Sequence, residues 1–186
     1  RSSLRSQQLS GSFISFAATE DQTILAAFAL LTDVKFLNND TNYKPLRATV
    51  MGCGGTGKSF IINTIISIIR KLTQRNSSIQ VGAPTGSAAF NVQGSTLHRL
   101  LGINVSRPEE SMNETTKEQL KKQLTNLLCL MIDERSMMSS KILAVAERNV
   151  RECAFNGQNS KEIWGGVPVV LLFGDDYQLF PVIDEG

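Results

Sequence analysis

Hydrophobic and polar positions follow two different rhythms along the chain. Nearly continuous apolar runs are typical of strands buried on both faces of a sheet, and apolar residues recurring every three or four positions are typical of helices. The continuous runs predict strands at residues 46–51, 78–83, 128–132 and 167–173. The periodic stretches predict helices at residues 19–36, 60–72, 95–102, 116–127 and 139–154. This alternation predicts an α/β fold, in which helices cover both faces of a parallel sheet.

Length and composition fit one domain of this kind. The chain has 186 residues, of which 41% are hydrophobic and 19% are charged, as in globular proteins with a substantial core. The Ser-rich opening predicts a flexible tail over residues 1–17, followed by one domain over residues 18–186. No apolar run approaches the roughly 18 residues of a membrane span, and none resembles a secretory signal. We therefore expect no membrane association.

Charge and cysteine usage narrow the setting only slightly. The net charge is +2, but residues 1–75 carry nine Lys/Arg against four Asp/Glu (+5) and residues 76–186 carry ten against thirteen (−3). The basic front half gives a weak indication of a polyanionic partner. Three widely spaced cysteines and one histidine form no zinc-binding pattern, and they fit a reducing, intracellular setting.

The clearest chemical signal is the stretch GCGGTGKS at residues 52–59, between a predicted strand and a predicted helix. It fits the phosphate-binding pattern G-x-x-x-x-G-K-S/T, in which backbone N–H groups and the positive end of the helix converge on phosphate oxygens. Lys58 is expected to reach the β- and γ-phosphates, and the Ser59 hydroxyl is expected to bind Mg²⁺. An ordinary glycine-rich turn is the alternative. The expected nucleotide-binding residues here are Gly54, Gly55, Thr56, Gly57, Lys58 and Ser59.

An acidic pair, Asp133 and Glu134, ends the predicted strand at residues 128–132. In P-loop enzymes a carboxylate at such a position holds Mg²⁺, and a neighbouring carboxylate can accept a proton from the attacking water. A solvated strand end is the alternative. The pair favours nucleotide hydrolysis. A GTPase is disfavoured because no N-K-x-D motif is present, and a small-molecule kinase would have no special need for Glu134.

The last predicted strand also ends in polar residues, in the stretch FGDDYQL. Its glutamine, Gln178, can reach the same edge of the sheet, where an amide could hold the γ-phosphate or the attacking water without acting as a base. A turn glutamine is the alternative.

Four stretches together identify a family resemblance. They are GCGGTGKS, APTGSAAFNVQGSTLHRLL at residues 83–101, IDERSM and GDDYQLFPV. In this order and spacing they resemble the PIF-type (petite integration frequency) DNA helicases, a RecD-like branch of superfamily 1. The resemblance covers residues 19–182 and implies a RecA-like ATPase domain that moves on single-stranded DNA.

The resemblance also implies roles for individual residues. Lys58 and Glu134 match the phosphate-binding lysine and the catalytic base, and Gln178 matches the γ-phosphate sensor. Ser59 and Asp133 match the magnesium ligands. The family's glutamine strand lies between the P-loop strand and the acidic-pair strand. The short stretch TEDQ resembles the motif that reads adenine, so Gln22 is expected to select ATP.

The stretch APTGSAAFNVQGSTLHRLL also matches the family's contacts with single-stranded DNA. Hydroxyls and N–H groups at helix starts suit phosphate oxygens, and an imidazole can stack on a base. A packed or capping role is the alternative for the histidine. The expected DNA-binding residues are Thr85, Gly86, Asn91, Thr96 and His98.

The chain departs from the family pattern at Arg135, Asp176, Tyr177 and Phe180. These departures leave the expected ATPase residues in place, but they put the coupling to DNA in question.

The resemblance implies the first motor domain of a 5′-to-3′ DNA helicase acting in repair, recombination or telomere maintenance. Its substrate is ATP with Mg²⁺, and its partners are single-stranded DNA and a second RecA-like domain. The nucleus or mitochondrion is expected in a eukaryote, and the cytoplasm otherwise. A P-loop ATP-binding module or switch without motor activity is the main alternative, and a decayed helicase relic is another.

Overall fold

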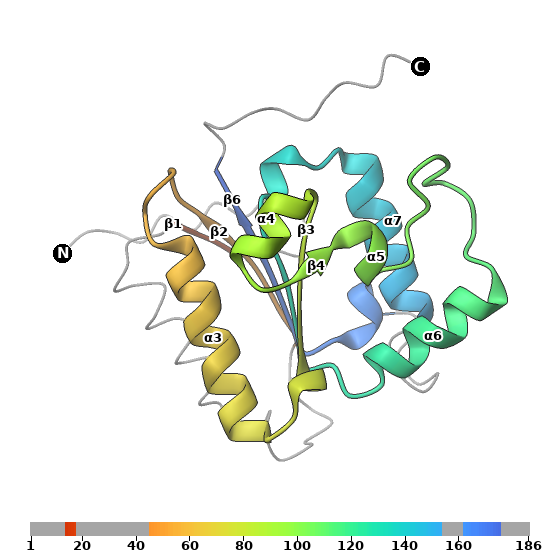
Figure 1. Ribbon diagram of the computed structural model, residues 1–186, viewed down its shortest axis with the longest axis horizontal. Coiled ribbons are helices and arrows are strands. Elements are labelled where there is room, and N and C mark those ends of the chain that lie inside the picture. The colour runs from red at the N-terminus through yellow and green to blue at the C-terminus, as the bar shows by residue number, and fades with distance from the viewer. Residues whose placement is uncertain (1–13, 18–44, 154–161, 176–186) are drawn as a thin grey trace.

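The fold is built on a six-stranded sheet in which every neighbouring pair of strands is parallel. The computed structural model in Figure 1 describes residues 14–17, 45–153 and 162–175. The strand order is β1-β2-β6-β5-β3-β4. The strands are β1 (Ile14–Ala17), β2 (Leu46–Met51), β3 (Ile79–Ala83), β4 (Ser95–Thr96), β5 (Cys129–Ile132) and β6 (Val169–Gly174).

Helices cover both faces of this sheet, as Figure 1 shows with the sheet seen nearly edge-on. One face is covered by α3 (Lys58–Thr73), and the other by helices that include α6 (Glu114–Leu124) and α7 (Ser140–Cys153). Two short helices, α4 (Gly86–Asn91) and α5 (Leu97–Leu100), flank β4, and 3₁₀ turns occur at η1 (Asn76–Ser78), η2 (Arg135–Met137) and η3 (Ile163–Gly166). The three layers confirm the predicted α/β architecture.

The two central strands divide their side chains between two hydrophobic cores. Leu130 and Leu172 belong to the core under α5, α6 and α7, whereas Met131 and Phe173 belong to the core under α3. Successive residues of a strand point to opposite faces, so a strand buried on both sides must be apolar throughout. This is why β5 and β6 appear in the sequence as unbroken apolar runs.

Helix α3 joins the phosphate-binding stretch to its core. It begins after Gly57 and buries Ile61, Ile62, Ile65, Ile66 and Ile69. It ends at Thr73, and the cap residue Gln74 donates its N–H to the carbonyl of Arg70 at 2.8 Å. The burial of five isoleucines anchors the start of the helix, and therefore the loop that precedes it.

The structure corrects the sequence prediction in two places. The predicted tail over residues 1–17 is wrong for residues 14–17, which form β1 and pair with β2 from Ala48 to Met51. A four-residue strand carries too short an apolar run to be recognised, because its formation depends on pairing with β2. The predicted helix at residues 95–102 begins instead as β4 and continues as the single turn α5.

The other predicted helices and strands appear with small shifts in their bounds, except the helix at residues 19–36, which lies outside the described residues. No helix in the described part of the chain is long and apolar enough to cross a membrane.

Candidate nucleotide-binding and nucleic-acid-binding site

Three strand ends meet at one edge of the sheet and bring the predicted motifs together. Strand β6 lies between β2, which leads into the P-loop, and β5, which leads into the acidic pair. The Gly52 N–H donates to the carbonyl of Gly174 at 3.1 Å, so the P-loop starts directly against the end of β6. The strand order that the family resemblance implies is therefore confirmed. Gln178 follows β6 but lies outside the described residues.

The P-loop is shaped by two glycines with positive φ. Gly55 has φ +79° and Gly57 has φ +83°, a region that residues with a Cβ rarely adopt. A Cβ added at Gly55 would meet no atom within 4 Å, so the backbone conformation, and not crowding, explains this glycine. Thr56 closes the turn, because its hydroxyl donates to the Cys53 carbonyl at 2.8 Å. Gly54 and Gly55 are exposed, so backbone at the turn is open to a ligand.

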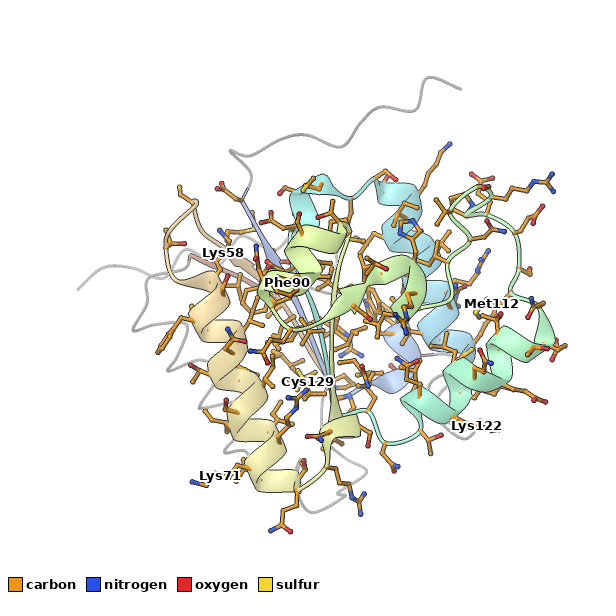
Figure 2. All side chains as sticks on the ribbon, viewed as in Figure 1. Lys58, Lys71, Phe90, Met112, Lys122 and Cys129 are labelled. Carbon is orange, nitrogen blue, oxygen red and sulfur yellow. The ribbon has the colours of Figure 1, made fainter. Side chains whose placement is uncertain are left out.

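Lys58 is the buried cation of this loop, with only 9% of its surface exposed. Its ammonium donates to the Gly52 carbonyl and, at 2.9 Å, to the Cys53 carbonyl. Figure 2 shows Lys58 at the end of α3 that meets the P-loop, with Lys71 at the opposite end. A lysine held in this way puts a positive charge where the loop can receive phosphate oxygens.

Asp133 lies buried at the end of β5, with 6% of its surface exposed. Its N–H donates to the Gly82 carbonyl at 2.9 Å, and its Oδ1 accepts the Glu134 N–H at 2.9 Å. Burial raises the pKa of the Asp133 carboxyl, and the charge of Glu134 acts in the same direction. The hydrogen bond from Glu134 and the charge of Lys58 oppose this effect. A bound cation would also favour the ionised form.

Glu134 adopts a left-handed conformation, with φ 53° and ψ 42°. This conformation costs a non-glycine residue about 1 kcal/mol or more, and such strain concentrates at functional sites. One carboxylate oxygen, Oε2, is buried and has no hydrogen-bond partner among the described residues. A buried carboxylate oxygen without a partner is suited to accept a proton from a bound reactant.

The residues predicted to bind magnesium offer a compatible set of oxygens. Ser59 is exposed in the first turn of α3, and Asp133 ends a strand of the same sheet edge. A hydroxyl and a carboxylate are hard ligands of the kind that Mg²⁺ prefers. No group of three or more His, Cys, Asp or Glu side chains suited to a metal occurs in the described ranges. An ion here would therefore complete its coordination with phosphate and water oxygens.

The residues predicted to bind DNA lie after β3, on the far side of β5 from the P-loop strand. Thr85 caps α4, where its hydroxyl accepts the Ala88 N–H at 3.3 Å, and Gly86 is exposed at the first helical position. Asn91 is exposed at the end of α4. Thr96 occupies the cap position of α5 without a capping hydrogen bond, and His98 is half-buried on that helix. The five positions thus lie in the segment that follows β3, on α4, β4 and α5 and at the cap of α4.

The expected roles of Gln22, Gln178 and Asp176 lie outside the described residues. Arg135 is half-buried, and its Cβ lies 3.5 Å from a Cβ built on Gly174, so this departure from the family pattern faces the end of β6.

Sequence reasoning missed three polar residues that join distant segments of the fold. Arg47 is 6% exposed in β2 and donates to the carbonyls of Leu46, Val167 and Ile163 at 2.7 to 2.9 Å. Its charge within an apolar strand was the available signal. On α7, the Asn149 amide donates to the Leu101 carbonyl at 2.9 Å, and Arg148 donates to the carbonyls of Glu109 and Glu110. No sequence pattern marks these two.

Comparison with known proteins identifies the family. A family model described as PIF1-like helicase matches residues 34–186. ATP-dependent DNA helicase RRM3 of Saccharomyces cerevisiae is 36% identical over 140 residues, which cover 70% of this chain and 18% of the yeast protein. ATP-dependent DNA helicase Pif1 of a Psychrobacter strain is 33% identical over 138 residues, which cover 73% of this chain and 20% of that protein. The chain therefore spans about a fifth of these relatives.

Solved structures support the same fold. A crystal structure of Bacteroides Pif1 bound to single-stranded DNA superposes with a TM-score of 0.54 at 34% identity, covering 82% of this chain and 33% of that one. Pif1 helicase from Bacteroides in complex with ADP-AlF₃ and single-stranded DNA gives a TM-score of 0.56 at 32% identity, with coverage of 83% and 33%. The fold is that of a RecA-like P-loop domain.

Proposed function

The chain belongs to the PIF1-like helicase family, and from this premise we propose that it is the first RecA-like motor domain of a 5′-to-3′ DNA helicase driven by ATP hydrolysis. The observation that carries the proposal is the meeting of the P-loop, the end of β6 and the acidic pair at one sheet edge. A domain that only bound Mg·nucleotide would use the P-loop and Asp133, but it would have no need of Glu134 as a base.

Hydrolysis would use the residues of this edge in distinct roles. The P-loop N–H groups and Lys58 hold the β- and γ-phosphate oxygens. Ser59 and Asp133 would hold Mg²⁺, whose charge stabilises the negative charge on those oxygens. Glu134 accepts a proton from water as the water oxygen bonds to the γ-phosphorus. The bond to the β–γ bridging oxygen then breaks, which leaves ADP and phosphate.

Movement on DNA would require parts beyond the described residues. Thr85, Gly86, Asn91, Thr96 and His98 are the proposed contacts of this domain with single-stranded DNA. The proposed second RecA-like domain would close over the nucleotide and contribute an arginine, which in related enzymes accelerates hydrolysis on the order of 10³-fold or more. Gln178 would transmit the state of the γ-phosphate between the domains. Gln22 would select adenine.

The wider setting follows from this activity and is part of the proposal. A motor that moves on DNA acts inside the cell, in the nucleus or mitochondrion of a eukaryote or in the cytoplasm of a bacterium. Repair, recombination and telomere maintenance are the processes in which we expect it to act.

Directional unwinding by the full-length protein tests the proposed function. Duplexes with a single-stranded 5′ overhang should be unwound in the presence of Mg·ATP, and duplexes with only a 3′ overhang should not. Lys58→Ala should abolish unwinding because it removes the phosphate-binding cation. Nucleotide binding without any unwinding would favour an ATP-binding module or switch instead. The 186-residue chain alone should bind nucleotide, hydrolyse it slowly and unwind nothing.

A further inference from the structure

Phe90, on α4, is the most exposed large hydrophobic residue in the described part of the chain (Figure 2). It is 83% exposed and contributes to neither of the two hydrophobic cores. One exposed apolar side chain is ordinary on a protein surface, so exposure alone assigns no role to Phe90. The backbone that holds the ring, its neighbours on α4 and the charge of the surrounding segment indicate what it can contact.

The ring projects from an anchored backbone. The inner side of α4 is fixed by Ala89 and by the following Val92, which are 4% and 0% exposed. The turn after the helix is closed by two backbone hydrogen bonds, from the Gln93 N–H to the Phe90 carbonyl at 3.1 Å and from the Gly94 N–H to the Ala89 carbonyl at 2.8 Å. Phe90 is therefore held outward by a helix that is packed on its other side.

The surface around the ring is open and polar. Gly86 and Ser87 lie one helical turn before Phe90, and all three are exposed, as is the adjacent Asn91. A Cβ built on Gly86 would meet no atom within 4 Å, so neither the ring nor any other group covers this part of the helix. An aromatic ring beside a hydroxyl and an amide can stack on a nucleobase while its neighbours form hydrogen bonds with the same nucleotide.

The charge of the segment favours a polyanion as the partner. Residues 41–108, which include α4, contain eight Lys/Arg and no Asp or Glu, whereas the other 118 residues contain eleven Lys/Arg and all seventeen Asp/Glu. A polyanion at α4 therefore meets no acidic side chain from this long stretch of the chain. Nucleic acid is the polyanion that also offers flat aromatic groups. In a duplex the bases stack on one another, so a free base face is offered by a single strand.

We propose that Phe90 is a base-stacking residue, whose ring packs against the face of one base of single-stranded DNA. This inference rests on the proposed function, and it adds an apolar contact to the proposed contacts of Gly86 and Asn91 on the same helix. The stack holds one nucleotide at a fixed position on α4, so the strand moves with this domain instead of sliding over it. Every base has such a face, so the contact suits a motor that must pass over any sequence.

The experiment measures the affinity of the full-length protein for two fluorescently labelled oligonucleotides of equal length. One is oligothymidylate, and the other has the same sugar–phosphate backbone with abasic sites in place of all its bases. Because stacking needs a base, the abasic strand removes the proposed contact from the DNA side, and Phe90→Ala removes it from the protein side. The two changes should therefore not add to each other.

We expect Phe90→Ala to raise the Kd for oligothymidylate by about 10-fold, as the loss of one stack on a base does in other proteins. The Kd for the abasic strand should be the same in the variant and the natural protein. Phe90→Tyr, which keeps an aromatic face, should restore most of the affinity. The dependence of Kd on salt should not change, because no phosphate contact is lost. Tm should also stay unchanged, because the exposed ring packs against neither core.

Leu72→Ala is the matched control. Leu72 is 52% exposed near the end of α3, next to Lys71, which Figure 2 shows at the end of the helix opposite the P-loop. Removing its side chain takes away exposed apolar surface outside the proposed DNA contacts, so the Kd for both oligonucleotides should stay at the natural value. A fall in affinity equal to that of Phe90→Ala would show a general effect of lost surface and would overturn the inference.

Other results separate the failure of this inference from the failure of the proposed function. Natural affinity for oligothymidylate in Phe90→Ala would overturn the role of Phe90 alone. Equal weakening of both oligonucleotides together with a lower Tm would also overturn it, because that is the result expected if the ring packs against another part of the full-length protein. If the natural protein bound neither oligonucleotide, the proposed function would fail, and the inference would fail with it.

Discussion

Two glycines of the predicted DNA-binding stretch, Gly86 and Gly94, should respond in opposite ways to the same substitution. A Cβ added at Gly94 would lie 2.5 Å from the carbonyl oxygen of Val81 and 3.0 Å from its carbonyl carbon. A Cβ added at Gly86 would meet nothing within 4 Å. Gly94 lies just before β4, which pairs with β3 through Gly82–Ser95 and Ala83–Thr96. Its small size is what lets the chain approach β3 there.

The expected cost of Gly94→Ala follows from the clash. Non-bonded carbon–oxygen contacts of this kind normally lie near 3.3 Å or beyond, so the backbone would have to move by about 0.8 Å. Val81 belongs to β3, which pairs with a strand on each side and therefore has little freedom to move. Overpacking of this severity costs about 3 kcal/mol. For a domain of this size that cost lowers Tm by about 6–12 °C. Gly86→Ala should leave Tm within about 2 °C, because alanine fits the first turn of α4.

Thermal unfolding followed by circular dichroism, paired with fluorescence measurement of single-stranded DNA affinity, checks both effects. Gly94→Ala should unfold early and lose DNA affinity, since Thr96 and His98 follow the displaced strand. The Gly86→Ala variant should unfold at the normal temperature. Its affinity for single-stranded DNA should still fall if the Gly86 backbone contacts a phosphate. A wild-type Tm in Gly94→Ala, or an equal fall in both variants, would refute the reasoning.

Three further substitutions or treatments test other parts of the structure. Asp133→Asn should abolish Mg-dependent hydrolysis but raise Tm at pH 7. Burial raises the pKa of the Asp133 carboxyl, so keeping it ionised in the folded protein costs stability, and asparagine removes that cost. In a series of melts, the difference in Tm between the variant and the natural protein should shrink as the pH falls toward about 4. Arg47→Met should lower the free energy of unfolding by about 3 kcal/mol or more, because four backbone carbonyls lose a charged donor. A urea titration showing a loss of less than about 1 kcal/mol would contradict this. An alkylating reagent should label the exposed thiol of Cys53 in the folded protein, and bound nucleotide should block this labelling. Cys129 and Cys153 are buried, and burial raises the pKa of both thiols, so they should be labelled only after unfolding. Intact-mass spectrometry counts the labels in each case.

The fold was predictable where the signal is carried by many residues at once. The isoleucines of α3 and the unbroken apolar runs of β5 and β6 each specify an element by repetition. The P-loop was predictable because a phosphate cradle needs glycines and a lysine at fixed spacing. Strand β4 was not, because a two-residue strand exists only where Gly94 allows close approach to β3.

The finer features of the candidate site depend on contacts between distant segments. Arg47 bonds carbonyls more than 100 positions away, and nothing in its own neighbourhood indicates them. The left-handed conformation of Glu134 and its unpaired carboxylate oxygen likewise appear only once β5, β6 and the P-loop are assembled. The roles of Gln22, Gln178 and the five DNA-binding residues stay predictions, since they depend on groups beyond the described residues.

The most direct test of the account is the steady-state ATPase rate of the full-length protein with and without single-stranded DNA, measured for the natural protein and for Glu134→Gln. We predict that DNA raises the rate many-fold in the natural protein, and that Glu134→Gln still binds Mg·ATP but shows almost no hydrolysis under either condition. An ATPase rate that does not respond to DNA, or a Glu134→Gln variant with full activity, would contradict the central claim that this sheet edge is the catalytic site of a DNA-driven motor.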